Sequence, residues 1–591
     1  MNGTWTLIAS VFPIVLALGI AFGPTRRPTM AAAWAAALPA LAVAISARNG
    51  KPIEIGWLLF GVEVDAPDDL ARALLLPVSL LWLAAGWFAE TYIARSSHRV
   101  SFWLFFLLTC GGNVGALLAR DVATFYVGYA VMTFSAYGLI LHDRTEAARR
   151  AGRVYIAMAL GGEVALLAAL WMIVGERVDL PISEAPLAAA RAARPDLVLG
   201  LLFVGFGVKA GVVPLHMWLP LAHPVAPAPA SAVLSGALIK AGLFGWLRFL
   251  PLGFVARPSW GTALIVVGLV TIAYAAVVGA LQREPKTVLA YSSSSQMGYM
   301  LLPLGIGLAV PGAAAAAVAA SLLFAQQHVL VKGALFLGTA VAAESVEPRT
   351  RRLVTGGLFV LALAIAGGPF TSGALAKLAV KGITTSVPNG SLLGAALAIG
   401  SIGSTLLMAR FLVSVVALPR SELADASHPA RGVVAPWLLL VGAALVQPVF
   451  AWSRGFPAAM LLQPNSVWSA SWPVAIGAFL ALAAGVAVVC GATIPAVAPG
   501  DLVVPIERVA TLARDSALPR GRHPWTDVSP GRRLAGRVAA DSLRKLEDGE
   551  ARMTGFRTLG LLVLLLALAS ATAMQCGSAR GTASAPERRA P

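Results

Sequence analysis

Apolar runs of about 20 residues follow one another along almost the whole chain, and no other feature constrains the fold as strongly. A helix of that length crosses roughly 30 Å of hydrocarbon. Only 12% of the 591 residues are charged, against about 25% in an ordinary soluble domain. We therefore exclude a soluble globular fold and predict an all-α polytopic membrane protein with about 14–16 transmembrane helices.

Charges, prolines and glycines bound sixteen candidate spans. These are 5–22, 30–47, 70–92, 100–119, 121–141, 153–175, 197–219, 230–250, 261–281, 287–308, 312–341, 351–382, 392–417, 433–452, 472–496 and 558–575. One long polar stretch, 500–557, precedes the last of them. Part of it predicts an amphipathic segment at the cytoplasmic interface. There, one helical face holds Ala535, Ala539, Leu543 and Leu546, and the other holds Arg533, Arg537, Asp541, Arg544 and Asp548. A solvated linker helix is the alternative.

The net charge of +17 indicates topology and not nucleic-acid binding, because the basic residues lie in short loops between the apolar runs. Alternate loops carry most of them, for example Arg26, Arg149 and Arg351, and the acidic stretch 54–69 falls on the other side. The positive-inside rule then places both termini outside the cytoplasm. No positive region precedes the first apolar run, so we expect a retained helix in the cell (inner) membrane.

Neither a cofactor nor a metal site is expected. Cys110, Cys490 and Cys576 lack the spacing of metal or cluster ligands, and the chain has no dinucleotide fingerprint. The protein is thus expected to have no redox or catalytic site of its own.

Charges inside the apolar runs point to function, since each costs about 2.5–3.5 kcal/mol on insertion scales and persists where it faces a wet interior path. They are Glu163, Lys209, Lys240, His328, Lys332, Lys377 and Lys381. A structural ion pair is the alternative for any one of them, but a single glutamate cannot pair five lysines. A row of such groups is what a proton relay needs.

Two of the predicted spans are interrupted. Pro214 follows Lys209 by five residues, and Gly367, Gly368 and Pro369 precede Lys377. Proline removes a backbone donor and breaks a helix. Paired interruptions in corresponding halves indicate an inverted repeat with the ion site at the breaks.

The run KAGVVPLHMWLPLAHPVAPAPASAVLSGALIKAGLFGWLRF resembles the signature of the antiporter-like membrane subunits of respiratory complex I, membrane-bound hydrogenases and Mrp sodium/proton antiporters. REPKTVLAYSSSSQMGYM, QHVLVKGALFL and GGPFTSGALAK extend the resemblance. It implies inverted five-helix repeats at 100–250 and 261–417, each with a broken helix. Further helices at 1–99 and 433–496, the segment 500–557 and a final helix at 558–575 would complete the chain.

The resemblance also implies a proton relay along the mid-membrane plane. Lys209 matches the lysine of the first broken helix and Lys240 that of the following span. His328 and Lys332 match the central pair, and Lys377 matches the ionisable residue of the second broken helix.

One position departs from the family pattern. The family has a glutamate about nine residues after an aspartate in the fifth span, whereas here Asp121 is followed by Ala130. Glu163 in the sixth span is a possible substitute partner for Lys209; a hydrogen bond elsewhere in the bundle is the alternative.

These features predict a proton-conducting subunit of a multi-subunit ion-translocating complex. That complex is a redox pump like complex I (an NADH:quinone oxidoreductase) or a hydrogenase, or else an Mrp-type cation/proton antiporter that also moves sodium. The partners would be other membrane subunits, with a redox arm in the first case. One alternative is the membrane half of a proton-driven inorganic-carbon uptake system with a soluble zinc protein, and a second is a non-conducting membrane anchor.

Overall fold

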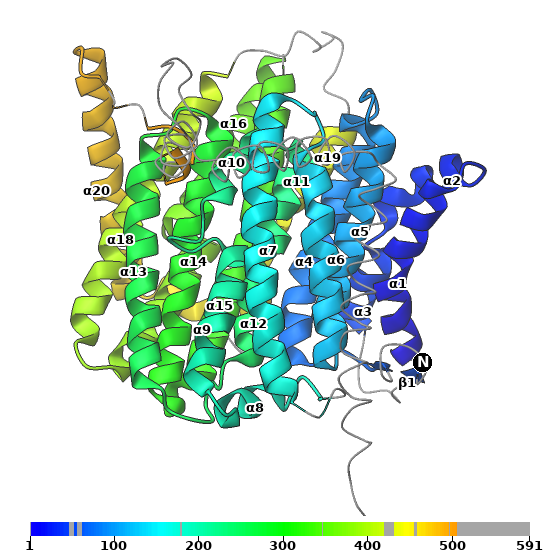
Figure 1. The fold of residues 1–591 in the computed structure, drawn as a ribbon. Helices are drawn as coiled ribbons and strands as arrows, with labels where there is room; N and C mark the ends of the chain where they lie inside the picture. The colour runs from blue at the N-terminus through cyan, green and yellow to red at the C-terminus, as the bar shows by residue number, and fades with distance from the viewer. Residues whose placement is uncertain are drawn as a thin grey trace, which may run out of the picture.

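The chain forms a bundle of helices that run side by side (Figure 1). The computed structural model describes residues 2–46, 53–55, 62–175, 177, 180–345, 347–418, 431–453, 458–493, 495, 497–500 and 502–504. Beside the helices, these residues contain one short antiparallel hairpin, β1 (Ile53–Ile55) and β2 (Val62–Val64). The predicted all-α class is confirmed.

The first half of the chain supplies the N-terminal edge of the bundle and the first interrupted helix. Its helices are α1 (Asn2–Ala21), α2 (Arg26–Ala32), α3 (Leu38–Ser46), α4 (Asp69–Tyr92), α5 (Arg99–Leu118), α6 (Val122–Ile140), α7 (Glu146–Val174), α8 (Ala185–Arg191), α9 (Pro195–Ala210), α10 (Trp218–Val225), α11 (Ala228–Val233) and α12 (Ile239–Phe249). A π-helical turn, Leu234–Leu238, joins α11 to α12.

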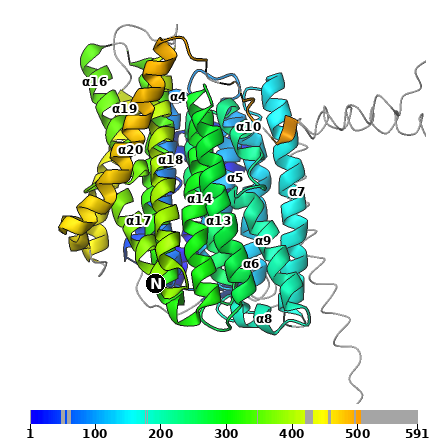
Figure 2. The ribbon, with the colours of Figure 1, turned by 90° about the vertical axis from the view of Figure 1, so that its left-hand side faces the viewer.

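The second half of the chain also consists of long helices, one of which is interrupted. Its helices are α13 (Pro258–Ala280), α14 (Pro285–Ala309), α15 (Ala314–Glu344), α16 (Pro348–Ala366), α17 (Ser372–Ile383), α18 (Gly390–Val416), α19 (Arg431–Ser453) and α20 (Pro464–Val489). Helix α20 lies at the opposite edge of the bundle from α1–α3 (Figure 1) and packs against α18, as the turned view also shows (Figure 2).

Twelve helical segments within the described residues are long and apolar enough to cross a membrane. Each of the fifteen predicted spans up to 472–496 overlaps a helix. The predicted spans missing from the twelve are the two interrupted ones and α14, whose apolar run contains four consecutive serines, 292–295. The predicted segment 500–557 and final helix 558–575 lie outside the described residues, apart from a few residues near 503. The inverted repeats and domain limits stay predictions.

Both interruptions begin at a glycine in the left-handed conformation. Gly211 (φ 68°) ends α9, and Gly367 (φ 85°) ends α16. Glycine adopts such angles without the steric penalty of a Cβ atom. Pro214 lies in the linker from α9 to α10, while Gly368 and Pro369 lie in the linker from α16 to α17. Each interrupted helix therefore leaves backbone carbonyls free in the interior.

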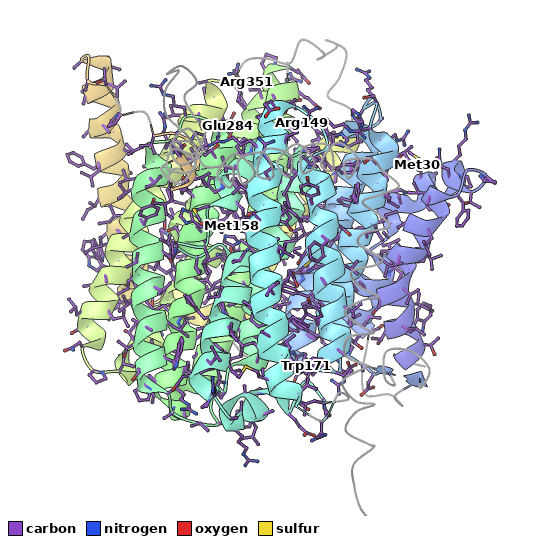
Figure 3. All side chains as sticks on the ribbon, viewed as in Figure 1. Met30, Arg149, Met158, Trp171, Glu284 and Arg351 are labelled. Carbon is purple, nitrogen blue, oxygen red and sulfur yellow. The ribbon has the colours of Figure 1, made fainter. Side chains whose placement is uncertain are left out.

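Charged residues of different loops lie at the same end of the bundle. Arg149 on α7, Arg351 on α16 and Glu284 before α14 lie near one end, whereas Trp171 lies near the other end of α7 (Figure 3). Arg149 and Arg351, which belong to loops predicted to lie on the same side of the membrane, therefore lie at a common end of the bundle.

Candidate functional site

All but one of the ionisable side chains predicted from the apolar runs are buried or half-buried in the bundle. Lys209, Lys240, Lys332, His328 and Glu163 are each at most 4% exposed. Lys377 is half-buried, and Lys381, one turn further along α17, is exposed. Groups that face the interior can exchange protons with one another instead of meeting lipid.

The first interruption holds Lys209 in the last turn of α9. The Trp218 indole nitrogen at the start of α10 donates to the backbone oxygen of Val208 (2.7 Å), which uses one of the freed carbonyls. The Lys209 ammonium donates to the Tyr155 hydroxyl on α7 at 3.3 Å. It also lies 5.6 Å and 5.5 Å from the ring centroids of Tyr129 and Tyr155, which stabilises the cation.

A close crossing connects this region to the next lysine. A Cβ atom on Gly242 of α12 would lie only 2.6 Å from the backbone oxygen of Phe206 and 2.8 Å from the backbone nitrogen of Ala210 on α9. Only a glycine permits such an approach of two backbones. Lys209 and Lys240 therefore sit on two helices in backbone contact, each within two residues of the crossing.

Lys240 and His328 form the centre of the site. The Lys240 ammonium is hydrogen-bonded to the His328 Nδ1 atom and donates to the Ser235 backbone oxygen at 3.0 Å. Ser235 belongs to the π-helical turn, where the usual i to i−4 bonding is displaced and carbonyls become available. The local irregularity thus provides a fixed acceptor for a buried ammonium group.

Lys332 joins the same network through α14. Its ammonium donates to the Leu289 backbone oxygen at 2.9 Å, and the Ser293 hydroxyl donates to that oxygen as well, also at 2.9 Å. The Ser293 hydroxyl lies 2.7 Å from the hydroxyl of Ser235. We call Lys240, His328, Lys332, Ser235 and Ser293 the central network. His328 and Lys332 also share one face of α15, one turn apart.

Lys377 occupies the second interruption. Its ammonium donates to the Ala366 backbone oxygen at the end of α16 (2.8 Å) and lies 4.9 Å from the Tyr299 ring centroid. The Tyr299 ring stacks on Phe324 of α15, one turn before His328. A pocket beside Lys377 reaches α20, and its mostly apolar lining includes the polar side chains of Lys381, Ser401 and Ser469. An aromatic pair therefore stands between Lys377 and the central network.

Three further groups were not predicted from the sequence. Tyr155 contacts Lys209, as described above. His223 on α10 is fully buried, and neither ring nitrogen has a hydrogen-bond partner within the described residues; its ring stacks on Phe336 at 4.5 Å. Lys286 donates to the Ala226 backbone oxygen at 2.8 Å. The sequence carries a signal for His223, since it is a histidine in an apolar run nine residues after Pro214.

The comparisons with known proteins identify the family of the chain. The family model described as NADH:quinone oxidoreductase/Mrp antiporter, transmembrane, matches residues 119–406. NADH-quinone oxidoreductase subunit N of Desulforudis audaxviator is 30% identical over 398 residues, which cover 63% of this chain and 76% of that protein. The chain belongs to this family. It is a multi-pass integral membrane protein.

Other family members match different shares of the chain. Hydrogenase-4 component B of Escherichia coli is 29% identical over 307 residues, so the chain spans only 45% of that relative, while the match covers 50% of this chain. A Na(+)/H(+) antiporter protein of Alkalihalophilus pseudofirmus is 26% identical over 437 residues, or 70% of this chain and 87% of the relative.

Two solved structures share the fold. One is the Mrp complex from Dietzia sp. DQ12-45-1b, with a TM-score of 0.70 and 21% identity, covering 93% of this chain and 63% of that chain. The other is the membrane-bound sulfane sulfur reductase, an archaeal respiratory membrane complex. Its TM-score is 0.64 and its identity 20%, and the match covers 93% of this chain and 100% of that chain.

Proposed function

We propose that the protein is the proton-conducting membrane subunit of a larger ion-translocating complex. One observation carries the proposal: the central network links two lysines and a histidine of α12 and α15 through a serine of α14, enclosed in the bundle. A purely structural role would leave such a row of ammonium groups without the carboxylates that normally compensate buried charge. A proton path uses them directly.

Each group has a part in this account. Lys209 holds a proton at the first interruption, and the central network exchanges it between Lys240, His328 and Lys332. Lys377 receives it at the second interruption. The Leu289 carbonyl carries no proton, but it holds the Lys332 ammonium and the Ser293 hydroxyl at one point, so that a short rearrangement or one water completes a transfer.

The energy for transport comes from partner subunits in this proposal. Relatives of the chain are named as components or subunits of larger systems, and contacts with such partners would bias the protonation of the relay. A redox arm is one such partner and a soluble zinc protein another; sodium is a second ion only in an antiporter. We further propose that the end of the bundle with Arg149 and Arg351 faces the cytoplasm in the cell (inner) membrane, with both termini outside.

The test is proton flux in proteoliposomes that contain the intact complex. Lys209→Ala should leave membrane insertion and complex assembly unchanged and abolish flux, because a relay fails when one transfer becomes too long. Wild-type flux from this variant would contradict the proposal and favour the non-conducting anchor. Identification of the copurifying chains would then decide between redox, antiporter and carbon-uptake partners.

A further inference from the structure

We infer that Glu163 on α7 is the switch carboxylate of Lys209, in place of the glutamate that Ala130 does not supply. The inference rests on the proposed function and assigns a proton-handling residue within it. The carboxylate has moved to the neighbouring helix, yet it serves the same lysine. Four observations on the packing of α6, α7 and α9 support this assignment.

First, Glu163 faces the bundle and not the lipid. Its side chain is 4% exposed, whereas its neighbours on α7, Leu160 and Val164, are 52% and 60% exposed. A buried carboxylate in an apolar helix is costly unless a polar partner in the bundle interior interacts with it.

Second, α7 and α9 approach each other next to both charged residues. A Cβ atom on Gly162 would lie 3.1 Å from the Val208 Cβ atom, and one on Gly205 would lie 2.9 Å from the Leu166 Cβ atom. Gly162 directly precedes Glu163, and Val208 directly precedes Lys209. Small residues at the crossing thus bring the carboxylate-bearing and ammonium-bearing turns together.

Third, the surroundings of the carboxylate come from the helix that carries Ala130. The Thr133 side chain on α6 lies near enough to the Glu163 carboxylate to interact with it, and Thr133 lies one turn after Ala130. The Thr133 hydroxyl also lies 2.8 Å from the Tyr129 backbone oxygen, so its single proton can turn to either acceptor. A glutamate at position 130 and the glutamate at position 163 would therefore both lie beside Thr133.

Fourth, the pair is open in this structure. The charges of Glu163 and Lys209 act on each other, but no contact within 4.0 Å joins Lys209 to a carboxylate of the described residues. The Lys209 ammonium is held by Tyr155 instead, and the Glu163 Oε2 atom has no hydrogen-bond partner among the described residues. A rotation of the lysine side chain from the tyrosine to this free oxygen would close the pair.

Closing and opening the pair would control the proton on Lys209. An adjacent carboxylate favours the ammonium form, and its withdrawal favours release of the proton. The Tyr155 hydroxyl, which donates to the Thr133 backbone oxygen at 2.7 Å, gives the open state a defined acceptor for the ammonium group. The Lys209 side chain therefore has two resting positions, one on the Tyr155 hydroxyl and one on the Glu163 carboxylate.

The test measures proton flux of the intact complex in proteoliposomes, with Glu146→Gln as the matched control. Glu146 lies on the same helix, but its side chain is 76% exposed, so this variant should keep wild-type flux. Glu163→Gln should assemble normally and reduce flux at least tenfold. Ala130→Glu added to Glu163→Gln should restore part of the flux, which a packing role for Glu163 would not allow.

A double-mutant cycle with Lys209→Arg, which keeps a cation and is expected to retain part of the flux, gives an independent readout. If the two residues act as one switch, the double variant should conduct no worse than the poorer single variant; independent sites would give multiplied losses. Multiplied losses, full flux from Glu163→Gln, or failure of that variant to assemble without recovery by Ala130→Glu would each overturn the inference. If the wild-type complex itself conducts no protons, the proposed function fails, and not this assignment alone.

Discussion

The Lys377 ammonium donates a 2.8 Å hydrogen bond to the backbone oxygen of Ala366, across the interruption that separates α17 from α16. The oxygen is free because the chain turns at Gly367, and the lysine is half-buried beside the Tyr299 ring. At the first interruption a neutral donor, the Trp218 indole, serves the corresponding purpose. The second interruption thus offers a cation directly to the freed helix end, where the helix dipole favours positive charge.

Lys377→Met should therefore abolish proton flux of the intact complex while the complex still assembles. The interruption between α16 and α17 would keep its fold, but the Ala366 carbonyl would lose its titratable partner. Lys381→Met is the matched control, one turn further along α17, where the ammonium is exposed and donates to Ser469. The measurement is flux in proteoliposomes for both variants. Equal loss in both would show that general charge at this edge matters and not the Lys377 position.

Ser293→Ala should slow proton flux without abolishing it. The hydroxyl bridges the Lys332 and Lys240 sides of the central network through Leu289 and Ser235, and a water can replace a missing hydroxyl only in part. Ser292→Ala provides the control, since its buried hydroxyl has no hydrogen-bond partner within the described residues. Identical flux in the two variants would remove Ser293 from the path.

Gly205→Val should separate α7 from α9. The added side chain would meet the Leu166 Cβ atom at 2.9 Å and the Gly162 backbone oxygen at 3.1 Å, and overpacking of this kind costs about 1–3 kcal/mol. We expect a lower thermal midpoint in detergent together with loss of flux. Gly161→Val on α7 is the control, because a Cβ atom there meets no atom within 4 Å, and it should change neither quantity.

Asp68 gives the structure an acid-dependent contribution to stability. Burial alone raises the pKa of the Asp68 carboxyl, but the hydrogen bond and charge of Arg248 outweigh it and hold that pKa below its usual value of 3.8. The carboxylate also accepts from the Ala71 backbone nitrogen at the start of α4, and two Arg248 nitrogens donate to it at 2.5 and 2.6 Å.

Because the pKa is lower in the folded state, this stabilisation is present above about pH 4 and is lost as the pH falls through the folded pKa. Asp68→Asn should lower the thermal midpoint at pH 7, and the difference from wild type should shrink towards pH 3. The adjacent Asp69 is exposed, so Asp69→Asn serves as the control. A difference that stays constant with pH would contradict the role of this ion pair.

The buried lysines were predictable because each interrupts an apolar run, where a charge tends to face the interior; Lys381, in the same run as Lys377, is the exception and is exposed. The helix interruptions were predictable as well, since Pro214 and the Gly367–Pro369 turn are local signals. The two serines of the central network were not, because Ser235 and Ser293 are 58 residues apart along the chain and meet only through the packing of α14 against the π-helical turn. The inward direction of Glu163 likewise depends on how α7 rotates against α9.

His223 shows a different limit. Its sequence context carried the signal, but its place beside Phe336, one turn beyond Lys332 on α15, follows from the path of α10 after the interruption. Short interrupted helices have no regular periodicity from which a facing direction could be read. The buried charges and the helix interruptions could thus be predicted from the sequence, whereas the contacts between helices could not.

The most direct test of the account is proton flux through the intact, purified complex in proteoliposomes with Lys332→Met, measured beside the wild type under the same imposed gradient. Lys332 is fully buried, and its ammonium is held by the Leu289 carbonyl at the centre of the proposed path. The account predicts that the variant assembles with its partners and that its flux falls to the level of empty liposomes. An assembled Lys332→Met complex that conducts protons at the wild-type rate would contradict it.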